Sequence, residues 1–247
     1  MRTEVLGVGF DSLTMEEAVD RAFSIIKEGR GSKAAYVVTP NPEIVWLCRS
    51  EPELKSAIDG AALVLPDGIG IIHGARILGT PLKKKVSGID FVQALMGRMA
   101  AEGMSVFLLG AKEGVARQAA KRLKELFPGL VIAGTHHGYF SDDEPIINII
   151  NEARPDLLLV CLGAPKQEYW MRNNAGKLKV GLMAGLGGTL DVFAGKVRRA
   201  PDSWQKLGLE WLYRLIQEPR RIKRMIKLPL FIIAVAGQRV GRRKNAG

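Results

Sequence analysis

Residues 105–135 read SVFLLGAKEGVARQAAKRLKELFPGLVIAGT, and this stretch decides the fold class. It opens with a short apolar run, Ser105–Leu109, and continues with a helical pattern over Val115–Phe127. Pro128-Gly129 ends that helix, and a second apolar run follows at Val131–Thr135. A strand, a helix and another strand in this order are typical of a mainly parallel sheet covered by helices.

The same alternation extends along most of the chain. Short apolar runs bounded by turn residues predict further core strands at residues 35–39, 63–65, 157–161 and 180–184. A strand near Glu4–Val8 is expected at a sheet edge, and Thr14 with Glu17 forms a capping-box pattern before a helix that ends at Gly29. The sequence therefore predicts an α/β fold with a Rossmann-like, mainly parallel sheet and helices on both faces.

The net positive charge lies in the C-terminal part of the chain. The 247 residues carry a net charge of +11, and from Lys196 onward fourteen Lys or Arg stand against three acids, a difference of +11. The first 195 residues therefore have no net charge. This shift predicts a core over residues 1–195 and a basic helical appendage over residues 196–247, with an anionic partner.

Apolar residues are interleaved with the basic ones in the appendage, which predicts basic amphipathic helices. They can pack on the core, close over a site or contact an anionic membrane surface. Leu228–Ala236 is apolar but short and contains Pro229, so it is not expected to span a bilayer. Nucleic-acid binding is disfavoured, because the basic residues lie at one end with apolar neighbours. The N-terminus lacks a signal-peptide pattern, so a cytoplasmic protein attached peripherally to the membrane is expected.

Metal ligands and cofactor motifs are scarce. Cys48 and Cys161 belong to no paired motif and are expected to be buried free thiols. No Asp-x-Asp pair is present, and His73, His136 and His137 lack ligand spacing. Neither a nucleophile-elbow serine nor a Walker loop occurs. We therefore expect a site without metal or cofactor, where Arg, Lys or backbone amides neutralise anionic groups.

The loops after strands of a parallel sheet form the ligand crevice. After 35–39, Thr39 and Asn41 offer hydrogen-bonding groups, although Asn41 before Pro42 equally fits a helix cap. After 63–65, Asp67 is either an N-cap or a general base for a hydroxyl nucleophile. The glycines at positions 68, 70 and 74 imitate a dinucleotide-binding pattern, which leaves a nucleotide-dependent oxidoreductase as the weaker alternative.

Two later loops are also candidates. Gly163–Glu168 starts a helix after the strand at 157–161, where Lys166 and free backbone N–H groups suit an anionic or hydroxyl-rich ligand. Residues 185–191 read GLGGTLD, and Asp191 can accept a hydrogen bond from a ribose or a base. The glycines of this loop serve either close ligand approach or tight packing.

Several blocks together resemble the WecG/TagA/CpsF glycosyltransferase family from about residue 3 to residue 227. The blocks are Thr39-Pro40-Asn41-Pro42-Glu43, Leu65-Pro66-Asp67-Gly68, Val86-Ser87-Gly88-Ile89-Asp90, Leu109-Gly110, Gly138-Tyr139-Phe140, Pro165-Lys166-Gln167-Glu168, Arg199-Ala200-Pro201 and residues 208–215, GLEWLYRL.

The resemblance implies a metal-independent, inverting transferase. In the TagA branch, N-acetylmannosamine moves from its UDP sugar onto undecaprenyl-diphosphate-linked N-acetylglucosamine, in a β-1,4 linkage, during wall teichoic acid assembly. Other branches use UDP-N-acetylmannosaminuronic acid or UDP-glucose and share these blocks, so the donor sugar stays open. The implied partners are a UDP-sugar donor, a polyprenyl-diphosphate-linked acceptor and an anionic membrane surface. A homo-oligomer is also possible, because an undocked appendage would leave apolar surface exposed on the core.

The family's functional residues can be carried over by position. Asp67 would be the base, with Thr39, Asn41 and Gln167 lining the pocket. The C-terminal arginines implied as diphosphate ligands are Arg214, Arg221 and Arg224. Lys85 stands where many relatives look to have arginine, which keeps the charge but loses bidentate phosphate geometry.

Overall fold

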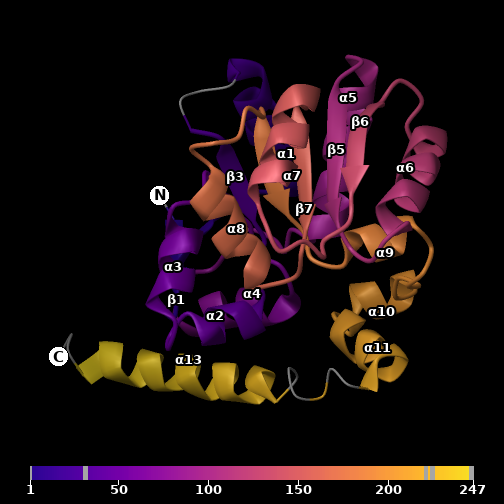
Figure 1. The fold of residues 1–247 in the computed structure, drawn as a ribbon. Coiled ribbons are helices and arrows are strands. Elements are labelled where there is room, and N and C mark those ends of the chain that lie inside the picture. The colour runs from indigo at the N-terminus through magenta and orange to yellow at the C-terminus, as the bar shows by residue number, and fades with distance from the viewer. Residues whose placement is uncertain (1, 30–32, 220–221, 223–225, 245–247) are drawn as a thin grey trace.

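A six-stranded parallel sheet forms the centre of the molecule in the computed structural model, which describes residues 2–29, 33–219, 222 and 226–244. The strand order is β4-β3-β8-β7-β5-β6, and every pairing in this sheet is parallel (Figure 1). Its strands are β3 (Ala35–Val38), β4 (Leu63–Val64), β5 (Ser105–Gly110), β6 (Val131–His136), β7 (Leu157–Cys161) and β8 (Leu182–Gly185).

Helices cover both faces of the sheet, because alternate strand residues point to opposite sides. Tyr36 and Val38 enter one apolar cluster, while Val37 between them enters the other. The first cluster is covered by α2 (Pro42–Leu47), α3 (Pro52–Asp59), α4 (Ile69–Ile77), α7 (Glu144–Ala153) and α8 (Lys166–Asn174). The second is covered by α1 (Met15–Glu28), α5 (Gly88–Ala101), α6 (Val115–Leu126) and α9 (Thr189–Phe193). The predicted α/β fold is confirmed.

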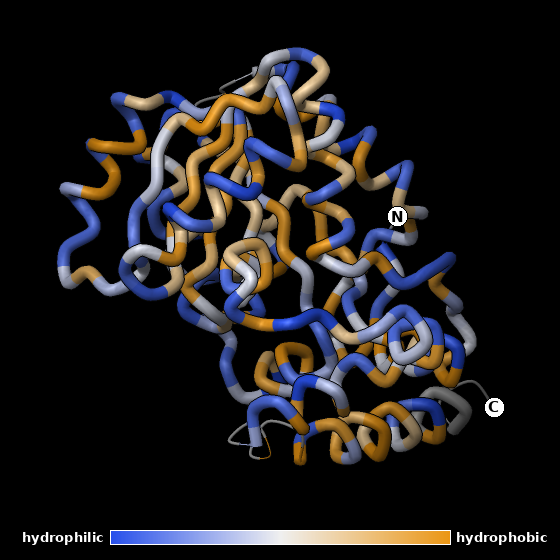
Figure 2. The backbone as a smooth tube through the Cα atoms, turned by 90° about the vertical axis from the view of Figure 1, so that its right-hand side faces the viewer, coloured by the Kyte–Doolittle hydropathy of each residue, from blue (hydrophilic) through white to orange (hydrophobic). Residues whose placement is uncertain are grey.

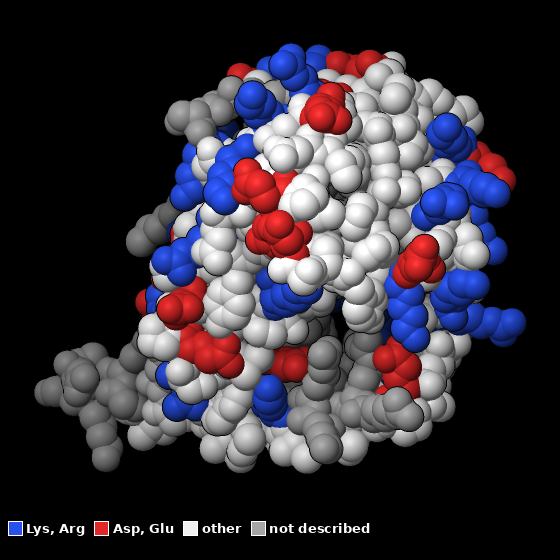
Figure 3. All heavy atoms as spheres, in the orientation of Figure 1, with Lys and Arg blue, Asp and Glu red and all other residues white. Residues whose placement is uncertain are grey.

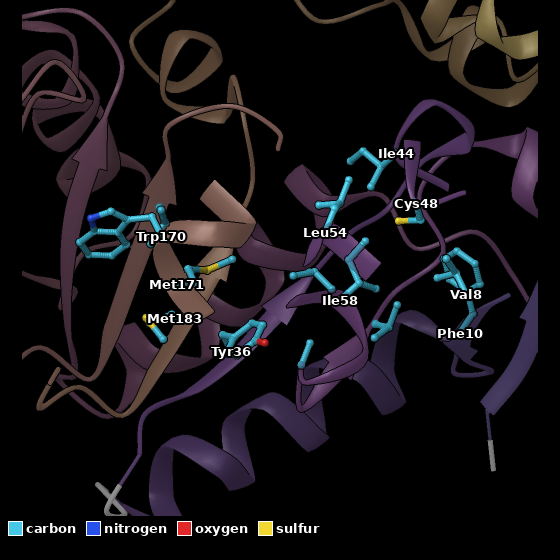
Figure 4. Close-up of a cluster of buried hydrophobic side chains, with 14 of the residues drawn as sticks. Val8, Phe10, Tyr36, Ile44, Cys48, Leu54, Ile58, Trp170, Met171 and Met183 are labelled. Atoms are coloured by element: carbon cyan, nitrogen blue, oxygen red, sulfur yellow. The ribbon is translucent and has the colours of Figure 1, made fainter. Parts of the chain in front are cut away.

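The N-terminal strand differs from expectation. The prediction of one strand at Glu4–Val8 on an edge of the main sheet is wrong: the segment is a hairpin of β1 (Arg2–Val5) and β2 (Val8–Asp11) in a sheet of its own. Leu6 and Gly7 form its turn with φ of 50° and 83°, as a two-residue hairpin turn requires. Figure 4 shows Val8 and Phe10 near Cys48, in the same apolar cluster as Ile44 of α2.

Most other element boundaries agree with the sequence patterns. Thr14 and Glu17 form the predicted capping box of α1, and Gly29 is its C-cap. Helix α6 ends just before Pro128, as predicted. The last strand was expected at residues 180–184, but β8 begins two residues later, at Leu182, and ends at Gly185. Cys48 and Cys161 are buried free thiols, and burial raises the pKa of both to about 12.

The C-terminal segment returns to the core. After α9 it forms α10 (Asp202–Lys206), α11 (Glu210–Gln217) and α13 (Lys227–Lys244). Helix α13 lies along α2 and α4, and its Phe231 and Val235 are fully buried in the same cluster as the hairpin (Figures 1 and 2). The packing alternative for this helix is therefore confirmed for its inner face. None of the helices in the described part of the chain is long and apolar enough to cross a membrane.

Candidate functional site

The loops that follow the central strands meet at the carboxyl edge of the sheet. Strand β3 lies between β4 and β8, so the loop with Thr39 and Asn41 neighbours the loop with Asp67. In Figure 1 this edge faces the segment that carries α10, α11 and α13, and Figure 3 shows a hollow between that segment and the body of the molecule. Parallel sheets bind ligands at this edge, which makes it the candidate site.

Three loops hold Asp67 in place. Its backbone N–H donates to the carbonyl of Pro40 at 3.3 Å, and the N–H of Val86 donates to the carbonyl of Pro66 at 3.0 Å. The N–H of Gly88, in the first turn of α5, donates to the Asp67 carboxylate. The carboxylate therefore faces the amino end of a 14-residue helix, where negative charge is favoured.

The protonation of Asp67 is set by its surroundings. Burial raises the pKa of its carboxyl from 3.8 to about 6, and the nearby carboxylate of Glu210 adds to the increase. Lys85, Arg214 and the Gly88 N–H oppose the increase without cancelling it. A partly buried carboxylate that is ionised near neutral pH can accept a proton from a bound hydroxyl group.

Asp67 does not cap α4, so the capping alternative predicted for it is wrong. The N-cap of α4 is Gly68, and no side chain caps this helix. Asn41, in contrast, is the N-cap of α2: its Oδ1 accepts a hydrogen bond from the N–H of Ile44 at 3.0 Å, and Pro42 occupies the first turn. The capping role predicted for Asn41 is therefore confirmed.

Thr39 lies against the amino end of α5. A Cβ at position 88 would come within 3.1 Å of Thr39 Oγ1 and 2.7 Å of Leu186 Cδ2, so a side chain there would require Leu186 to shift. This close approach brings the loops after β3 and β8 together beside Asp67. Asp191, the other polar residue predicted in the loop after β8, lies in the first turn of α9 and is partly exposed.

Gln167 is buried and already paired within the protein. It is 3% exposed, its Oε1 accepts from the N–H of Gly187 at 2.8 Å, and its Nε2 donates to Glu168 Oε1 at 2.9 Å. Through these bonds it ties the loop after β7 to the loop after β8. Glu168 occurs in a quoted sequence block but had no predicted role. It is 1% exposed, and its Oε2 is buried with no hydrogen-bond partner among the described residues. Burial raises the pKa of this carboxyl, against the opposing hydrogen bond from Gln167.

Lys85 and Glu210, which act electrostatically on Asp67, belong to an ion-pair network. Lys85 Nζ lies 2.5 Å from Glu210 Oε2, and the Arg199 guanidinium makes two hydrogen bonds to Asp90, at 2.5 and 2.6 Å. Arg199 also lies 3.8 Å from Glu210 Oε1. Arg199, Asp90 and Glu210 occur in the quoted sequence blocks, yet only the structure reveals their pairing.

Helix α11 contributes Arg214, the third cation of the site after Lys85 and Arg199. Glu210 and Arg214 are one helical turn apart, and both act electrostatically on Asp67. The turn before α11 packs on the start of α4: at Gly208, with φ of 72°, a Cβ would lie 3.0 Å from Ile69. Of the predicted C-terminal arginines, Arg214 is thus near Asp67, while Arg221 and Arg224 lie outside the described residues.

Two of the three glycines that imitated a dinucleotide motif serve helix packing, and the third, Gly68, is the N-cap of α4. A Cβ at Gly70 would lie 2.7 Å from the Pro42 ring, and one at Gly74 would lie 3.1 Å from the Phe231 ring. These glycines let α2 and α13 approach α4. The oxidoreductase alternative therefore loses the pattern on which it rested. Across residues 2–29, 33–219, 222 and 226–244, no group of three or more His, Cys, Asp or Glu is placed to hold a metal ion.

Comparison with known proteins shows the family of this chain. The family model described as "Glycosyl transferase WecG/TagA/CpsF family" matches residues 3–245. The chain belongs to this family. It is 35% identical to the N-acetylglucosaminyldiphosphoundecaprenol N-acetyl-beta-D-mannosaminyltransferase of Bacillus spizizenii, over 83% of this chain and 79% of that protein. The protein of the same name from Staphylococcus aureus strain MW2 is 32% identical over 95% of this chain and 92% of its own length. The chain is therefore a WecG/TagA/CpsF glycosyltransferase.

Proposed function

We propose that this glycosyltransferase moves N-acetylmannosamine from UDP-N-acetylmannosamine onto undecaprenyl-diphosphate-linked N-acetylglucosamine, in wall teichoic acid or related envelope polymer synthesis. The observation that carries the proposal is Asp67, a carboxylate with a pKa of about 6 that lies among cations at the carboxyl edge of the sheet. The names of the two relatives support the choice of acceptor and of sugar.

The proposed reaction is a single inverting displacement. Asp67 removes the proton from the C4 hydroxyl of the acceptor sugar, and that oxygen attacks the anomeric carbon of the donor from the face opposite UDP. The bond from the anomeric carbon to the diphosphate breaks, a β-1,4 linkage forms, and UDP leaves with the bonding electrons. Lys85 and Arg214 stabilise the negative charge on the leaving diphosphate, and Arg221 and Arg224 are proposed to join them. Thr39, Asn41 and Asp191 are proposed to contact the substrates, and Gln167 is proposed to position the loop at Gly187.

A coupled assay tests this proposal. UDP release should require the purified protein, UDP-N-acetylmannosamine and a lipid-diphosphate-linked N-acetylglucosamine together. Release of UDP at the same rate without the acceptor would mean that water, and not the acceptor hydroxyl, is the nucleophile. No release with any UDP sugar would contradict the proposed activity.

Turnover should depend on the ionisation of Asp67. Because the base must be deprotonated, kcat should rise with pH and reach half its maximum near pH 6, the pKa of the carboxyl. Its raised pKa makes the neutral carboxyl the form that folding favours, so protonation of Asp67 between pH 7 and pH 5 does not destabilise the protein. Melting temperatures measured over the same pH range separate a titrating base from unfolding. A kcat that stays constant from pH 5 to pH 8 would exclude Asp67 as the base.

Chelation should leave turnover unchanged. We propose that Lys85, Arg214 and the amino end of α5 carry the charge stabilisation that a divalent cation supplies in other transferases. The measurement is the initial rate in millimolar EDTA, compared with the rate after magnesium or manganese is restored. Loss of activity in EDTA with recovery on either metal would contradict the metal-free mechanism.

The outer face of α13 supports peripheral attachment to the inner face of the cell membrane. Opposite the buried Phe231 and Val235, Ile233 and Val240 are 67% and 56% exposed, and Ile226, just before the helix, is 58% exposed. A helix with one face on the protein and a second apolar face in solvent can enter the headgroup region of a bilayer. Basic residues of the same segment would then meet anionic lipid.

Ile233→Glu should weaken binding to anionic liposomes about tenfold or more, because burying an isoleucine contributes ~1.5–3 kcal/mol. Ile149→Glu is the matched control: Ile149 is 44% exposed on α7, so the same charge enters an exposed isoleucine site elsewhere. Cosedimentation with vesicles measures both. Equal binding by the two variants and the wild type would mean that α13 does not enter the bilayer.

A further inference from the structure

The carboxylate of Glu210 lies between two cations beside Asp67. Its Oε2 is 2.5 Å from Lys85 Nζ, and its Oε1 is 3.8 Å from the Arg199 guanidinium. The two cations come from different places, the loop before α5 and the segment before α10. Both carboxylate oxygens thus face a positive group, an arrangement that two oxygens of a phosphate can also adopt.

Among the described residues, the charges around Asp67 are balanced. The charged residues that act on Asp67, or that pair with those residues, are three cations (Lys85, Arg199, Arg214) and three acids (Asp67, Asp90, Glu210). A diphosphate that enters here would find no positive charge in excess from these six. Displacement of one acid would leave an excess of positive charge among these six residues for the diphosphate.

Glu210 is the acid best placed to move. Asp90 is fixed in the first turn of α5 and holds Arg199 through two hydrogen bonds. Glu210 lies in the first turn of α11, after the turn at Gly208, and the Lys85–Glu210 pair is partly open to solvent, with side chains 22% and 27% exposed. The Arg199 Nε is buried and has no hydrogen-bond partner among the described residues, so Glu210 and Asp90 do not satisfy this guanidinium completely.

We propose that Lys85 and Arg199 form the binding site for a substrate diphosphate. Glu210 occupies this site in the ligand-free chain and is displaced when the diphosphate binds. This inference rests on the proposed function and adds two residues to it. Arg199 becomes a binding residue, and Glu210 becomes a carboxylate that competes with the substrate. Glu210 lies in the first turn of α11, and Arg214 follows it one helical turn later.

Binding of UDP to the full chain tests the proposal. Isothermal titration should show that Glu210→Gln binds UDP at least ~5-fold more tightly than wild type, the low end of typical coupling between sites. Asp202→Asn is the matched control, because Asp202 is an exposed acid that acts on Arg199 but does not pair with Lys85. It should leave UDP affinity within about twofold of wild type, and the gain from Glu210→Gln should disappear when Lys85 is replaced by alanine.

The donor and the lipid acceptor both carry a diphosphate, so farnesyl diphosphate is titrated in parallel. If Glu210→Gln binds UDP more tightly than wild type does, the site belongs to the donor. If it binds farnesyl diphosphate more tightly, the site belongs to the acceptor. Equal or weaker binding of both ligands by Glu210→Gln overturns the proposal. If that variant does not fold, Glu210→Asp replaces it: the shorter side chain withdraws the carboxylate from Lys85, and the same gain is expected. Wild-type protein that binds neither ligand and shows no turnover contradicts the proposed function itself.

Discussion

Asp67→Asn should lower kcat by ~10²–10⁴ while the protein stays folded, because removal of a general base typically costs this much. Asparagine has nearly the same shape as aspartate and can still accept the hydrogen bond from the Gly88 N–H, but it cannot take up a proton. Binding of UDP should change little, since the lost function is proton transfer. Initial rates and UDP titration measure the two effects separately.

The same variant should be more stable than wild type at neutral pH. Burial raises the pKa of Asp67 from 3.8 to about 6, so the ionised carboxylate opposes folding, and its removal should raise the free energy of unfolding by ~1–3 kcal/mol. The gain is expected above pH 6 and should vanish below the ordinary pKa of 3.8, where both folded and unfolded chains are protonated. Equal losses of activity and of melting temperature would instead indicate a structural role.

Arg214→Ala should lower kcat by ~10²–10³, the usual cost of removing one group that stabilises charge in a transition state. Arg214 acts on Asp67 from the last turn of α11, one helical turn after Glu210. Lysine at this position should restore part of the rate, because it keeps the charge without the forked geometry of arginine.

Arg198→Ala provides the matched control for Arg214→Ala. Arg198 is an exposed arginine of the same C-terminal segment, and its replacement should leave kcat within about twofold. Liposome binding should be preserved in both variants, since neither changes the apolar face of α13. Equal activity of Arg214→Ala and wild type would remove α11 from the proposed mechanism.

The strands of the sheet and several caps could be predicted because their signals are local. The apolar runs at 105–109 and 157–161 coincide with β5 and β7, and Asn41 before Pro42 forms the expected cap. The N-terminal hairpin was missed because Leu6-Gly7 lacks the usual Asn-Gly or Asp-Gly turn signal, and leucine rarely adopts a positive φ. The order of the strands depends on crossovers that no local pattern records.

The candidate site could be predicted by its loops but not by its pairings. Asp67 and Thr39 were recognised because they follow strands whose carboxyl ends meet at one edge. Lys85 and Glu210 are 125 positions apart, and Arg199 and Asp90 are 109 apart, so their contacts exist only after the chain folds. Gln167 was expected in the pocket, and its sequence position alone could not reveal that Gly187 and Glu168 already occupy its amide group.

Mass spectrometry of the lipid product tests the central claim most directly. The full-length protein is incubated with undecaprenyl-diphosphate-linked N-acetylglucosamine and, separately, with UDP-N-acetylmannosamine, UDP-N-acetylmannosaminuronic acid, UDP-glucose and UDP-N-acetylglucosamine. We predict that the acceptor gains the mass of one N-acetylhexosamine with UDP-N-acetylmannosamine, that the other donors give little product, and that Asp67→Asn gives almost none. An acceptor whose mass is unchanged with every donor, or a product formed equally well by Asp67→Asn, would contradict the account.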